Sequence, residues 1–318
     1  MKYYFLINPN AGKGKAAEFI KPKIEEYIAK SGIDAEIYMP SSGKDGREFV
    51  HNKCMTGEKI RVYACGGDGT LFQIINGAYG FDNVEVGIIP LGSGNDFAKM
   101  LGEKETLLNV ENQVEGATVK FDLVKSGDTV GISHCSVGID AVICAKKDDF
   151  NKLPFMTGEM AYVASTLYCF LGNIARKITV KIDDGEPFTI NSIFCLAANA
   201  QWYGGGFKSA PYANLTDGKL DFIVVEKKLS KLKLFPIIAA YKSGNHLTGK
   251  YDDFVTFKQG KKITVHSDTP IPMICDGEST TITDATFEMV EKGINFIVPK
   301  NCEYYNTHKD EFLSPATV

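Results

Sequence analysis

Several signatures that would identify a function class at once are missing from this 318-residue chain. Its eight cysteines include no C-x-x-C pair, and its five histidines form no H-x-x-H or H-E-x-x-H pattern, so the common zinc-ligand spacings are absent. No segment approaches the ~20 apolar residues of a membrane-spanning helix. The first apolar stretch stops at Asn8-Pro9, too early for a signal peptide. We therefore expect a cytoplasmic protein with free thiols, which meets a membrane only from its surface.

An excess of positive charge is also missing. The chain has 35 Lys and Arg against 39 Asp and Glu, a net charge of −4. Proteins dedicated to nucleic-acid binding are more often strongly basic, so we expect no nucleic-acid partner. Hydrophobic residues make up 44% of the chain and charged residues 23%, which is typical of globular proteins and not of disordered ones. At roughly 150 residues per domain, the length predicts about two domains.

The sequence pattern changes near residue 122. Before it, short apolar segments alternate with helical patterns, which is typical of βαβ units around a parallel sheet. The predicted strands are 3–7, 35–39, 60–65 and 84–89, and the predicted helices are 15–30, 46–55 and 71–79. After it, many short strand-like segments are separated by Gly, Asp and Pro. This second pattern predicts an antiparallel sandwich or barrel.

Three glycine-rich turns in the first half follow predicted strands and open into helices. They are 8–14, 66–70 and 90–96, and the last two contain an aspartate. In doubly wound sheets, ligands bind outside the carboxyl ends of the strands. Glycines there let the backbone approach a phosphate, whose charge the free N–H groups of a helix start can accept. One such turn is an ordinary connection, but three in one domain predict a nucleotide site.

The first of these turns also fits a different class of enzyme. Gly12, Gly14 and Ala17 match G-x-G-x-x-A, and Glu36 lies near the end of the next predicted strand, as in dinucleotide-binding oxidoreductases. This alternative leaves the other two turns unexplained. The P-loop pattern G-x-x-x-x-G-K-[S/T] does not occur in the chain.

The segment Gly66-Gly67-Asp68-Gly69-Thr70 resembles the GGDGT motif that diacylglycerol and sphingosine kinases share with NAD kinases. Its neighbours resemble the lipid-kinase branch: Asn8-Pro9-x-x-Gly12, and Pro90-Leu91-Gly92-Ser93-Gly94-Asn95-Asp96. Further matches are Gly138-Ile139-Asp140-Ala141, Gly204-Gly205-Gly206, the stretch from Ala210 to Asp221, and Asp276-Gly277-Glu278. In this order they extend from residue 8 to residue 278. They are most similar to the soluble bacterial diacylglycerol kinases.

This resemblance implies a fold. An α/β nucleotide-binding domain over residues 1–122, similar to that of NAD kinases, would be joined by the returning residues 294–318. An antiparallel β-sandwich domain for the lipid would span residues 123–293, with the active site in the cleft between the two.

The resemblance also implies a reaction. The γ-phosphoryl group of ATP would pass, with Mg²⁺, to the primary hydroxyl of a lipid, and diacylglycerol would become phosphatidic acid. Two alternatives stay open: an NAD kinase, and a nucleotide- or lipid-binding regulator without turnover. A homodimer is compatible with the sequence but not required by it.

The resemblance places ATP and its Mg²⁺ on the three turns. The glycine amides of 66–69 would bind the phosphates, Thr70 would add a hydroxyl, and Asp68 would hold the cation. Ser93 stands where the family usually has Thr, and Ser41 or Ser42 where a Thr often contacts the nucleotide. The implied set is Asn8, Gly12, Ser41, Gly66, Gly67, Asp68, Gly69, Thr70, Ser93, Asn95 and Asp96. Asp68 and Asp96 could instead simply cap the helices that follow them.

The resemblance gives two turns of the second half a role. Asp276 would be the general base that takes the proton from the lipid hydroxyl, with Glu278 supporting it. Asp217 would bind a structural Mg²⁺ together with the backbone carbonyls of Asn214 and Lys219. Both segments also read as ordinary turns, a D-G hairpin and an Asn-x-x-Asp-Gly turn.

Two helical patterns are candidates for lipid contact. The stretch 227–242 is both basic and apolar, so it could lie on an anionic membrane, although a core-packing helix with solvated lysines is the simpler interpretation. The apolar residues of 160–171 could line an acyl groove or pack in the core.

Overall fold

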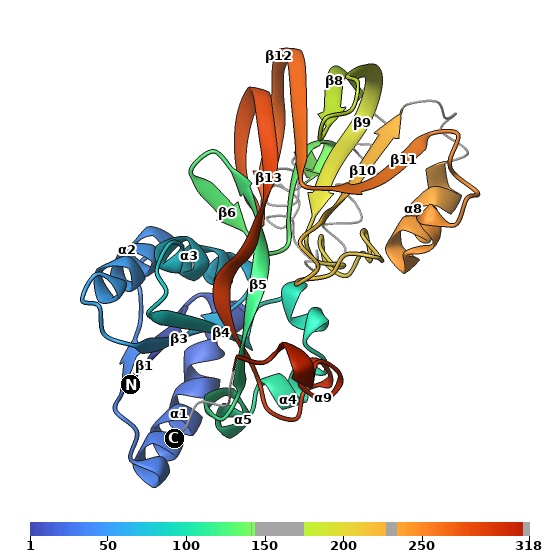
Figure 1. The fold of residues 1–318 in the computed structure, drawn as a ribbon. Helices are drawn as coiled ribbons and strands as arrows, with labels where there is room; N and C mark the ends of the chain where they lie inside the picture. The colour runs from blue at the N-terminus through green and yellow to red at the C-terminus, as the bar shows by residue number, and fades with distance from the viewer. Residues whose placement is uncertain (141, 144–174, 227–233, 314–318) are drawn as a thin grey trace. The chain divides into compact units, whose positions relative to one another are not determined.

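The computed structural model describes residues 1–140, 142–143, 175–226 and 234–313. The chain divides into two compact units, one of residues Met1–Asp122 and Glu291–Val318, the other of Leu123–Val290 (Figure 1). The predicted helix at 160–171 and the lysines of 227–233 lie outside the described residues. None of the described helices combines the length and the apolar character needed to cross a membrane.

A parallel sheet forms the centre of the first unit. Strand β1 (Lys2–Ile7) lies between β2 (Ala35–Tyr38) and β3 (Ile60–Gly66), and β3 also pairs with β4 (Val84–Pro90). Strand β3 is buried along its whole length, as the apolar sequence of a strand covered on both faces predicts.

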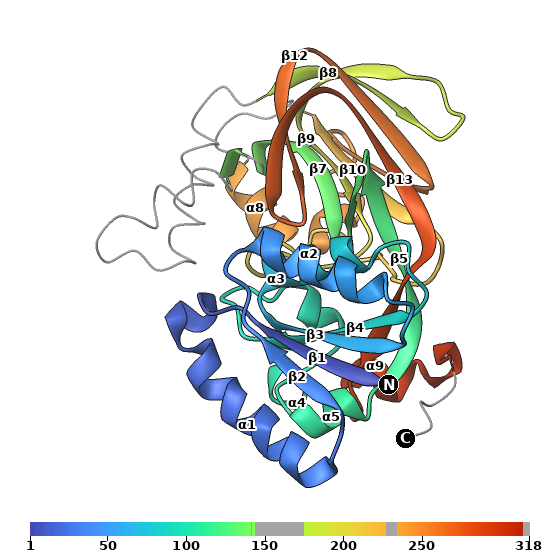
Figure 2. The same ribbon diagram turned by 90° about the vertical axis from the view of Figure 1, so that its left-hand side faces the viewer.

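Helices cover both faces of this sheet (Figure 2). Helices α2 (Gly43–Cys54) and α3 (Asp68–Ala78) lie on one face and α1 (Ala16–Ser31) on the other. Two of the helices begin earlier than the sequence pattern predicts. Helix α2 begins at Gly43 because the Ser42 hydroxyl accepts the Asp45 N–H at 3.1 Å and caps the helix. Helix α3 begins at Asp68, so the glycine-rich turn runs directly into its first turn.

The C-terminal end of the chain belongs to the first unit. The last residues of β13 (Glu278–Val298) add a further parallel strand, with Phe296 opposite Val86 of β4. The buried Phe296 ring stacks on Phe121 of β5 (Ala117–Ser126), with centroids 5.2 Å apart. The remaining short helices of this unit are α4 (Lys104–Leu107), α5 (Val110–Val114) and α9 (Glu303–Thr307), with 3₁₀ turns at Ala11–Gly14, Phe97–Met100 and Lys309–Glu311.

The second unit is antiparallel throughout its described pairings. Its strands are β6 (Thr129–Gly131), β7 (His134–Gly138), β8 (Arg176–Ile182), β9 (Phe188–Ala198), β10 (Leu220–Glu226), β11 (Val255–Gly260), β12 (Lys262–Cys275) and the first part of β13. Strands β9 and β12 each pair with β8 along their first half and with β7 along their second half. The sheet therefore folds back on itself, as the sequence pattern predicts for a sandwich or barrel.

Helix α8 (Leu234–Ser243) and a 3₁₀ turn (Asn245–Leu247) pack on the second unit. Pro236 lies in the first turn of α8, where the missing N–H of proline costs no helical hydrogen bond. Ile237, Ala240 and Tyr241 pack against the apolar core of the unit. For this part of the basic-apolar stretch, the core-packing interpretation is therefore correct.

Candidate active site

The three glycine-rich turns meet at one edge of the first unit, because β1, β3 and β4 are parallel neighbours whose carboxyl ends lie together. The Leu91 N–H donates to the Gly66 carbonyl at 2.8 Å, which ties the third turn to the second. The Asn8 side chain donates to the Thr70 hydroxyl at 3.0 Å, which ties the first turn to the second. The structure thus brings these predicted nucleotide-site residues into one cluster.

The glycines of the second and third turns are required by close packing of backbone on backbone. A Cβ atom on Gly92 would lie 2.5 Å from the Cα of Gly67, and one on Gly66 would collide with the Thr70 side chain. Asn95 closes the third turn, because its amide accepts from the Gly92 N–H at 2.9 Å and donates to the Gly92 carbonyl at 2.7 Å. The resulting turn leaves Ser93 exposed.

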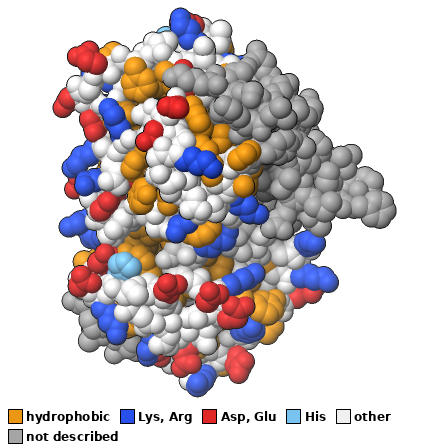
Figure 3. Space-filling view, turned by 90° about the vertical axis from the view of Figure 1, so that its right-hand side faces the viewer, with side chains coloured by type: hydrophobic (Ala, Val, Ile, Leu, Met, Phe, Trp, Pro, Cys, Tyr) orange, Lys and Arg blue, Asp and Glu red, His pale blue; other side chains and the backbone are white. Residues whose placement is uncertain are grey.

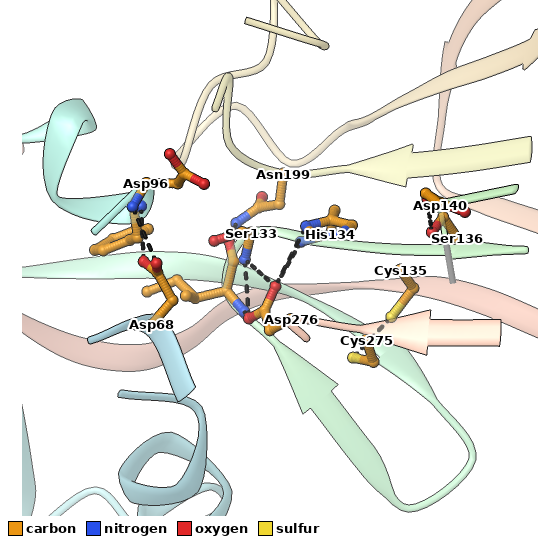
Figure 4. A network of polar contacts seen from close by, with 12 residues as sticks. Asp68, Asp96, Ser133, His134, Cys135, Ser136, Asp140, Asn199, Cys275 and Asp276 are labelled. Atoms are coloured by element: carbon orange, nitrogen blue, oxygen red, sulfur yellow. Dashed lines mark hydrogen bonds and ion pairs between the residues drawn. The ribbon is translucent and has the colours of Figure 1, made fainter. Parts of the chain in front are cut away.

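The Asp68 carboxylate connects the second turn to the third (Figure 4). It accepts the backbone N–H groups of Asp96 and Phe97, each at 3.1 Å, and so caps the short 3₁₀ turn that begins at Phe97. The sequence suggested that Asp68 could cap the helix that follows it, but the N-cap of α3 is Gly67, and Asp68 instead caps the turn of the neighbouring loop. Asp96 occupies the N-cap position of that 3₁₀ turn without a side-chain capping bond. Burial and the nearby Asp96 carboxylate raise the pKa of Asp68, so two acidic groups lie at the point where the loops converge.

Such a pair of carboxylates fits a hard divalent cation. Mg²⁺ prefers carboxylate oxygens and keeps several waters, so one or two acidic side chains beside a phosphate are enough to hold it. Asp96 also forms an ion pair with Lys99, whose Nζ lies 2.6 Å from its Oδ1. The donor set of Asp68 and Asp96 is therefore compatible with Mg²⁺ bound to a phosphate group.

The first turn and the serines after β2 have local structural contacts. The Asn8 side-chain Oδ1 accepts the Asn10 N–H at 2.9 Å, and Gly12 lies in the left-handed region with φ 58°. Ser41 donates through its N–H and its hydroxyl to the Asp45 carboxylate, at 2.7 and 2.9 Å. The Ser41 hydroxyl is thus directed at Asp45 at the start of α2.

In the second unit, Asp276 and Gly277 form a two-residue hairpin turn between β12 and β13. Both have positive φ, 44° and 99°, as a type I′ turn requires. The D-G turn suggested from the sequence is therefore observed. Glu278 lies just after the turn, exposed and directly across the ladder from Cys275.

Three backbone amides hold the Asp276 carboxylate within this unit (Figure 4). The N–H groups of Ile132, Ser133 and His134 donate to it, with shortest distances of 2.6, 3.1 and 2.8 Å. The Asp276 side chain is only 4% exposed. Hydrogen bonds to a charged acceptor are strong, so this aspartate is held in one orientation.

The residues around Asp276 were not predicted from the sequence. The His134 Nδ1 lies 3.7 Å from the Asp276 Oδ1, and its ring lies against Tyr203 with centroids 4.2 Å apart. The Asn199 side chain donates to the Ile132 carbonyl at 2.8 Å and so braces the loop before β7. Backbone donors have no side-chain signature, so no sequence motif could have identified them.

The predicted structural metal site lies in a surface turn. Asp217 is exposed and accepts the Lys219 N–H at 3.0 Å, while Asn214 accepts the Thr216 N–H at 3.0 Å, as in Asx turns. The nearby Asp221 is buried, and burial raises its pKa to about 6. Among the described residues, no group of three His, Cys, Asp or Glu side chains is arranged to hold a metal ion. A cation bound by Asp217 and the carbonyls of Asn214 and Lys219 therefore stays a prediction.

Comparison with known proteins adds to this geometry. The family model for the diacylglycerol kinase catalytic domain matches residues 2–126. The model for the YegS C-terminal NAD kinase beta sandwich-like domain matches residues 133–298. Together these two models account for most of the chain.

Relatives that match nearly the whole chain are named diacylglycerol kinases. A diacylglycerol kinase of Staphylococcus carnosus is 26% identical over 300 residues, covering 93% of this chain and 94% of the relative. A diacylglycerol kinase of Bacillus subtilis is 23% identical over 302 residues, covering 93% of this chain and 95% of the relative. A crystal structure of a diacylglycerol kinase from Bacillus anthracis has the same fold, with a TM-score of 0.66 at 17% identity, covering 93% of this chain and 96% of that chain. The α/β unit and the antiparallel β-sandwich unit are therefore those of a known enzyme architecture.

Proposed function

The chain belongs to the diacylglycerol kinase catalytic-domain family, and from this premise we propose that it transfers the γ-phosphoryl group of ATP to the primary hydroxyl of a lipid, with diacylglycerol as the preferred acceptor. The convergence of three glycine-rich turns on Asp68 carries the proposal, because it is a backbone arrangement suited to a phosphate chain. Relatives over nearly the whole chain are named diacylglycerol kinases. None of the observations favours NAD as the acceptor.

Phosphoryl transfer depends mainly on positioning and on neutralising charge. The amides of the 66–70 turn would bind the phosphates, and Asn8 would hold Thr70 in place beside them. Asp68, with Asp96 nearby, would hold the Mg²⁺ that accompanies ATP. When bound, this cation would supply positive charge against the phosphate oxygens.

Asp276 would accept the proton of the lipid hydroxyl. A general base must reach its proton at about 2.6–3.2 Å, and three backbone amides hold this carboxylate in a single orientation. Glu278 would support it from the first residue of β13. Asp217, with the carbonyls of Asn214 and Lys219, would bind a structural Mg²⁺ in the second unit.

Access to the lipid would be peripheral, from the membrane surface. One face of the molecule shows basic and acidic side chains interspersed over the described residues (Figure 3), and the net charge is −4. Attraction to an anionic membrane would therefore need a local basic segment, and the sequence offers one at 227–233, ahead of the core-packed part of the stretch.

The test is an acceptor panel with the purified full-length chain. The protein is incubated with radiolabelled ATP, Mg²⁺ and one acceptor at a time: diacylglycerol, monoacylglycerol, undecaprenol, a sphingoid base or NAD. Labelled phosphatidic acid supports the proposal. A different labelled lipid would support the lipid-kinase reaction but show that diacylglycerol is not the preferred acceptor. Labelled NADP would instead establish the NAD kinase. ATP binding without any labelled product would indicate a regulator.

A further inference from the structure

Two cysteines face each other across neighbouring strands in the second unit. Cys135 of β7 and Cys275 of β12 are directly opposite in the ladder, and both are buried. Their sulfur atoms lie 2.9 Å apart (Figure 4). They are separated by 140 residues in the sequence, and no spacing motif links them.

Their position in the ladder suits a covalent link. The Asp276 N–H donates to the His134 carbonyl at 3.1 Å, which is one of the two backbone bonds of a hydrogen-bonded pair, while the His134 N–H donates to the Asp276 carboxylate; 276 and 134 thus occupy a hydrogen-bonded position of the ladder. The next pair, Cys275 and Cys135, is therefore a non-hydrogen-bonded pair, in which antiparallel Cα atoms lie about 4.5 Å apart and side chains are closest. Disulfides take Cα separations of about 4.4–6.8 Å, so a bond could form here with little backbone movement.

The same pair lies next to the carboxylate that we propose as the general base. Cys275 directly precedes Asp276, and Cys135 directly follows His134, whose N–H donates to Asp276. Strand β12, which leads into Asp276, and strand β7, whose His134 N–H binds it, therefore each contain one cysteine of the pair. A displacement of either sulfur would be transmitted to Asp276 or to its amide donors within one residue.

We propose that an oxidant of the peroxide class converts Cys135 and Cys275 into a reversible disulfide, and that this bond lowers phosphoryl transfer by displacing Asp276. One sulfur attacks the peroxide, which breaks the O–O bond, gives a sulfenic acid and releases one water. The second thiol attacks that sulfur, the S–S bond forms and a second water leaves. Two electrons pass from the two sulfurs to the peroxide, and a dithiol reductant returns them. The effect on activity rests on the proposed lipid-kinase function, whereas the bond itself does not.

The two thiols should react only slowly with the oxidant. The contact with Cys135, together with burial, raises the pKa of the Cys275 thiol well above its usual range. Because the thiolate is the reactive form, oxidation at neutral pH is slow and needs sustained exposure. The disulfide is accordingly a response to lasting oxidant and not to brief fluctuations.

The experiment treats the purified chain with hydrogen peroxide, digests it without reductant and identifies linked peptides by mass spectrometry. A Cys135–Cys275 peptide pair should appear, and kinase activity should fall about tenfold or more and return with dithiothreitol, since sub-ångström to ångström misplacement of a catalytic group has effects of this order. Cys135→Ala should abolish both changes. Cys54→Ala, at a buried thiol of the first unit, should leave both intact.

Absence of the linked peptide after prolonged treatment would overturn the proposal, as would a linked peptide with unchanged activity. If Cys135→Ala does not fold, Cys275→Val provides the same test from the other strand. If the untreated chain phosphorylates no lipid, the proposed function fails, while the peptide map still decides whether the disulfide forms.

Discussion

At the scale of single residues, two aspartates have the same structural role, one in each unit. Asp68 and Asp276 each accept backbone N–H groups from a loop that is distant in sequence, and each thereby fixes a turn. Their substitutions should therefore separate a chemical role from a structural one. An asparagine keeps one oxygen acceptor and nearly the same shape, so it tests the charge.

Asp276→Asn should lower kcat by about 10²–10⁴-fold, the usual cost of removing a general base, because the amide cannot take up the hydroxyl proton. ATP affinity should stay the same. Steady-state kinetics with a short-chain diacylglycerol, together with ATP titration, measure both. Near-normal turnover in a folded variant would assign Asp276 to the turn alone.

Asp68→Asn should raise the Mg²⁺ concentration needed for half-maximal activity at least about tenfold, because a neutral amide is a weaker ligand for a hard cation. The remaining oxygen can still accept one of the N–H groups that cap the Phe97 turn. Activity is followed over a Mg²⁺ titration. Asp82→Asn, at an exposed carboxylate of the same unit, is the matched control and should not shift the curve. An unchanged Mg²⁺ requirement for Asp68→Asn would place the cation elsewhere.

At the scale of elements, close contacts between turns and helices decide what each segment can tolerate. The second and third glycine-rich turns touch through Gly67 and Gly92, backbone against backbone. Helix α8 and the 3₁₀ turn after it bury Tyr241 and His246 against each other, with ring centroids 4.6 Å apart. A substitution at either contact should therefore have a measurable effect, on ATP binding for the turns and on stability for the helix.

Gly92→Ala should weaken ATP binding by about tenfold or more, equivalent to ~1.4 kcal/mol. Its Cβ would lie 2.5 Å from the Gly67 Cα and 2.9 Å from the Asn95 Oδ1, so the two turns must move apart. Nucleotide titration by fluorescence or calorimetry measures the change. Gly43→Ala is the control, because its Cβ meets only the flexible Gln73 side chain. Equal ATP affinity in the two variants would contradict a phosphate site between these turns.

His246 should make the second unit lose stability in acid. Burial lowers its pKa from 6.5 to about 4, so between these values the unfolded chain binds the proton more readily than the folded chain. The contribution of His246 to stability is therefore complete above pH 6.5 and is lost as the pH falls toward 4. It amounts to about 3 kcal/mol.

Urea unfolding of the parent and of His246→Phe between pH 4 and pH 7 would measure this effect. The variant should show a flatter pH dependence, because the proton-binding group is gone while an aromatic ring still contacts Tyr241. His51→Gln, at an exposed histidine, should follow the parent. Parallel curves for the parent and His246→Phe would show that His246 does not titrate in this way. Burial raises the pKa of Asp221, so its contribution to stability changes with pH in the opposite direction. Because Asp221 is present in all three proteins, this contribution does not affect the comparison.

At the scale of the whole molecule, the chain builds two units with different sheet types from one continuous sequence. It passes between them twice, within β5 and within β13, and not through a Gly- or Pro-rich linker. The glycine-rich turns belong to the first unit and Asp276 belongs to the second. The proposed substrate is a membrane lipid, whereas the chain as a whole is acidic.

Membrane attachment should therefore depend on charge and be local. Each lysine near an anionic surface contributes about 1 kcal/mol, and salt screens it. Co-sedimentation with vesicles should increase with phosphatidylserine content and decrease with added salt. Replacing Lys228, Lys231 and Lys233 with Gln should weaken it, while activity on a soluble short-chain lipid persists. Equal vesicle binding by the triple variant and the parent would show that this segment does not contribute to membrane binding.

Local patterns were enough to predict much of the first unit. Its strands and helices follow from short periodic segments, and the glycine-rich turns follow from residues that lie next to one another. The second unit was less predictable. The sequence pattern there predicts separate short strands, among them 263–266 and 272–275, but these two segments form one strand, β12, with a register irregularity between His266 and Ile271. Continuity across such an irregularity depends on the partner strand.

Residue types at short spacing were sufficient to predict the two sheet types and to reveal the resemblance to lipid kinases, which in turn implied candidate residues for phosphoryl transfer. The groups that hold those residues in place became visible only in the folded chain. The amides that bind Asp276 lie 142 to 144 positions away along the chain, and Cys135 lies 140 positions from Cys275. Contacts of this kind arise when distant strands pair in one register, and pairing leaves no mark on either strand alone.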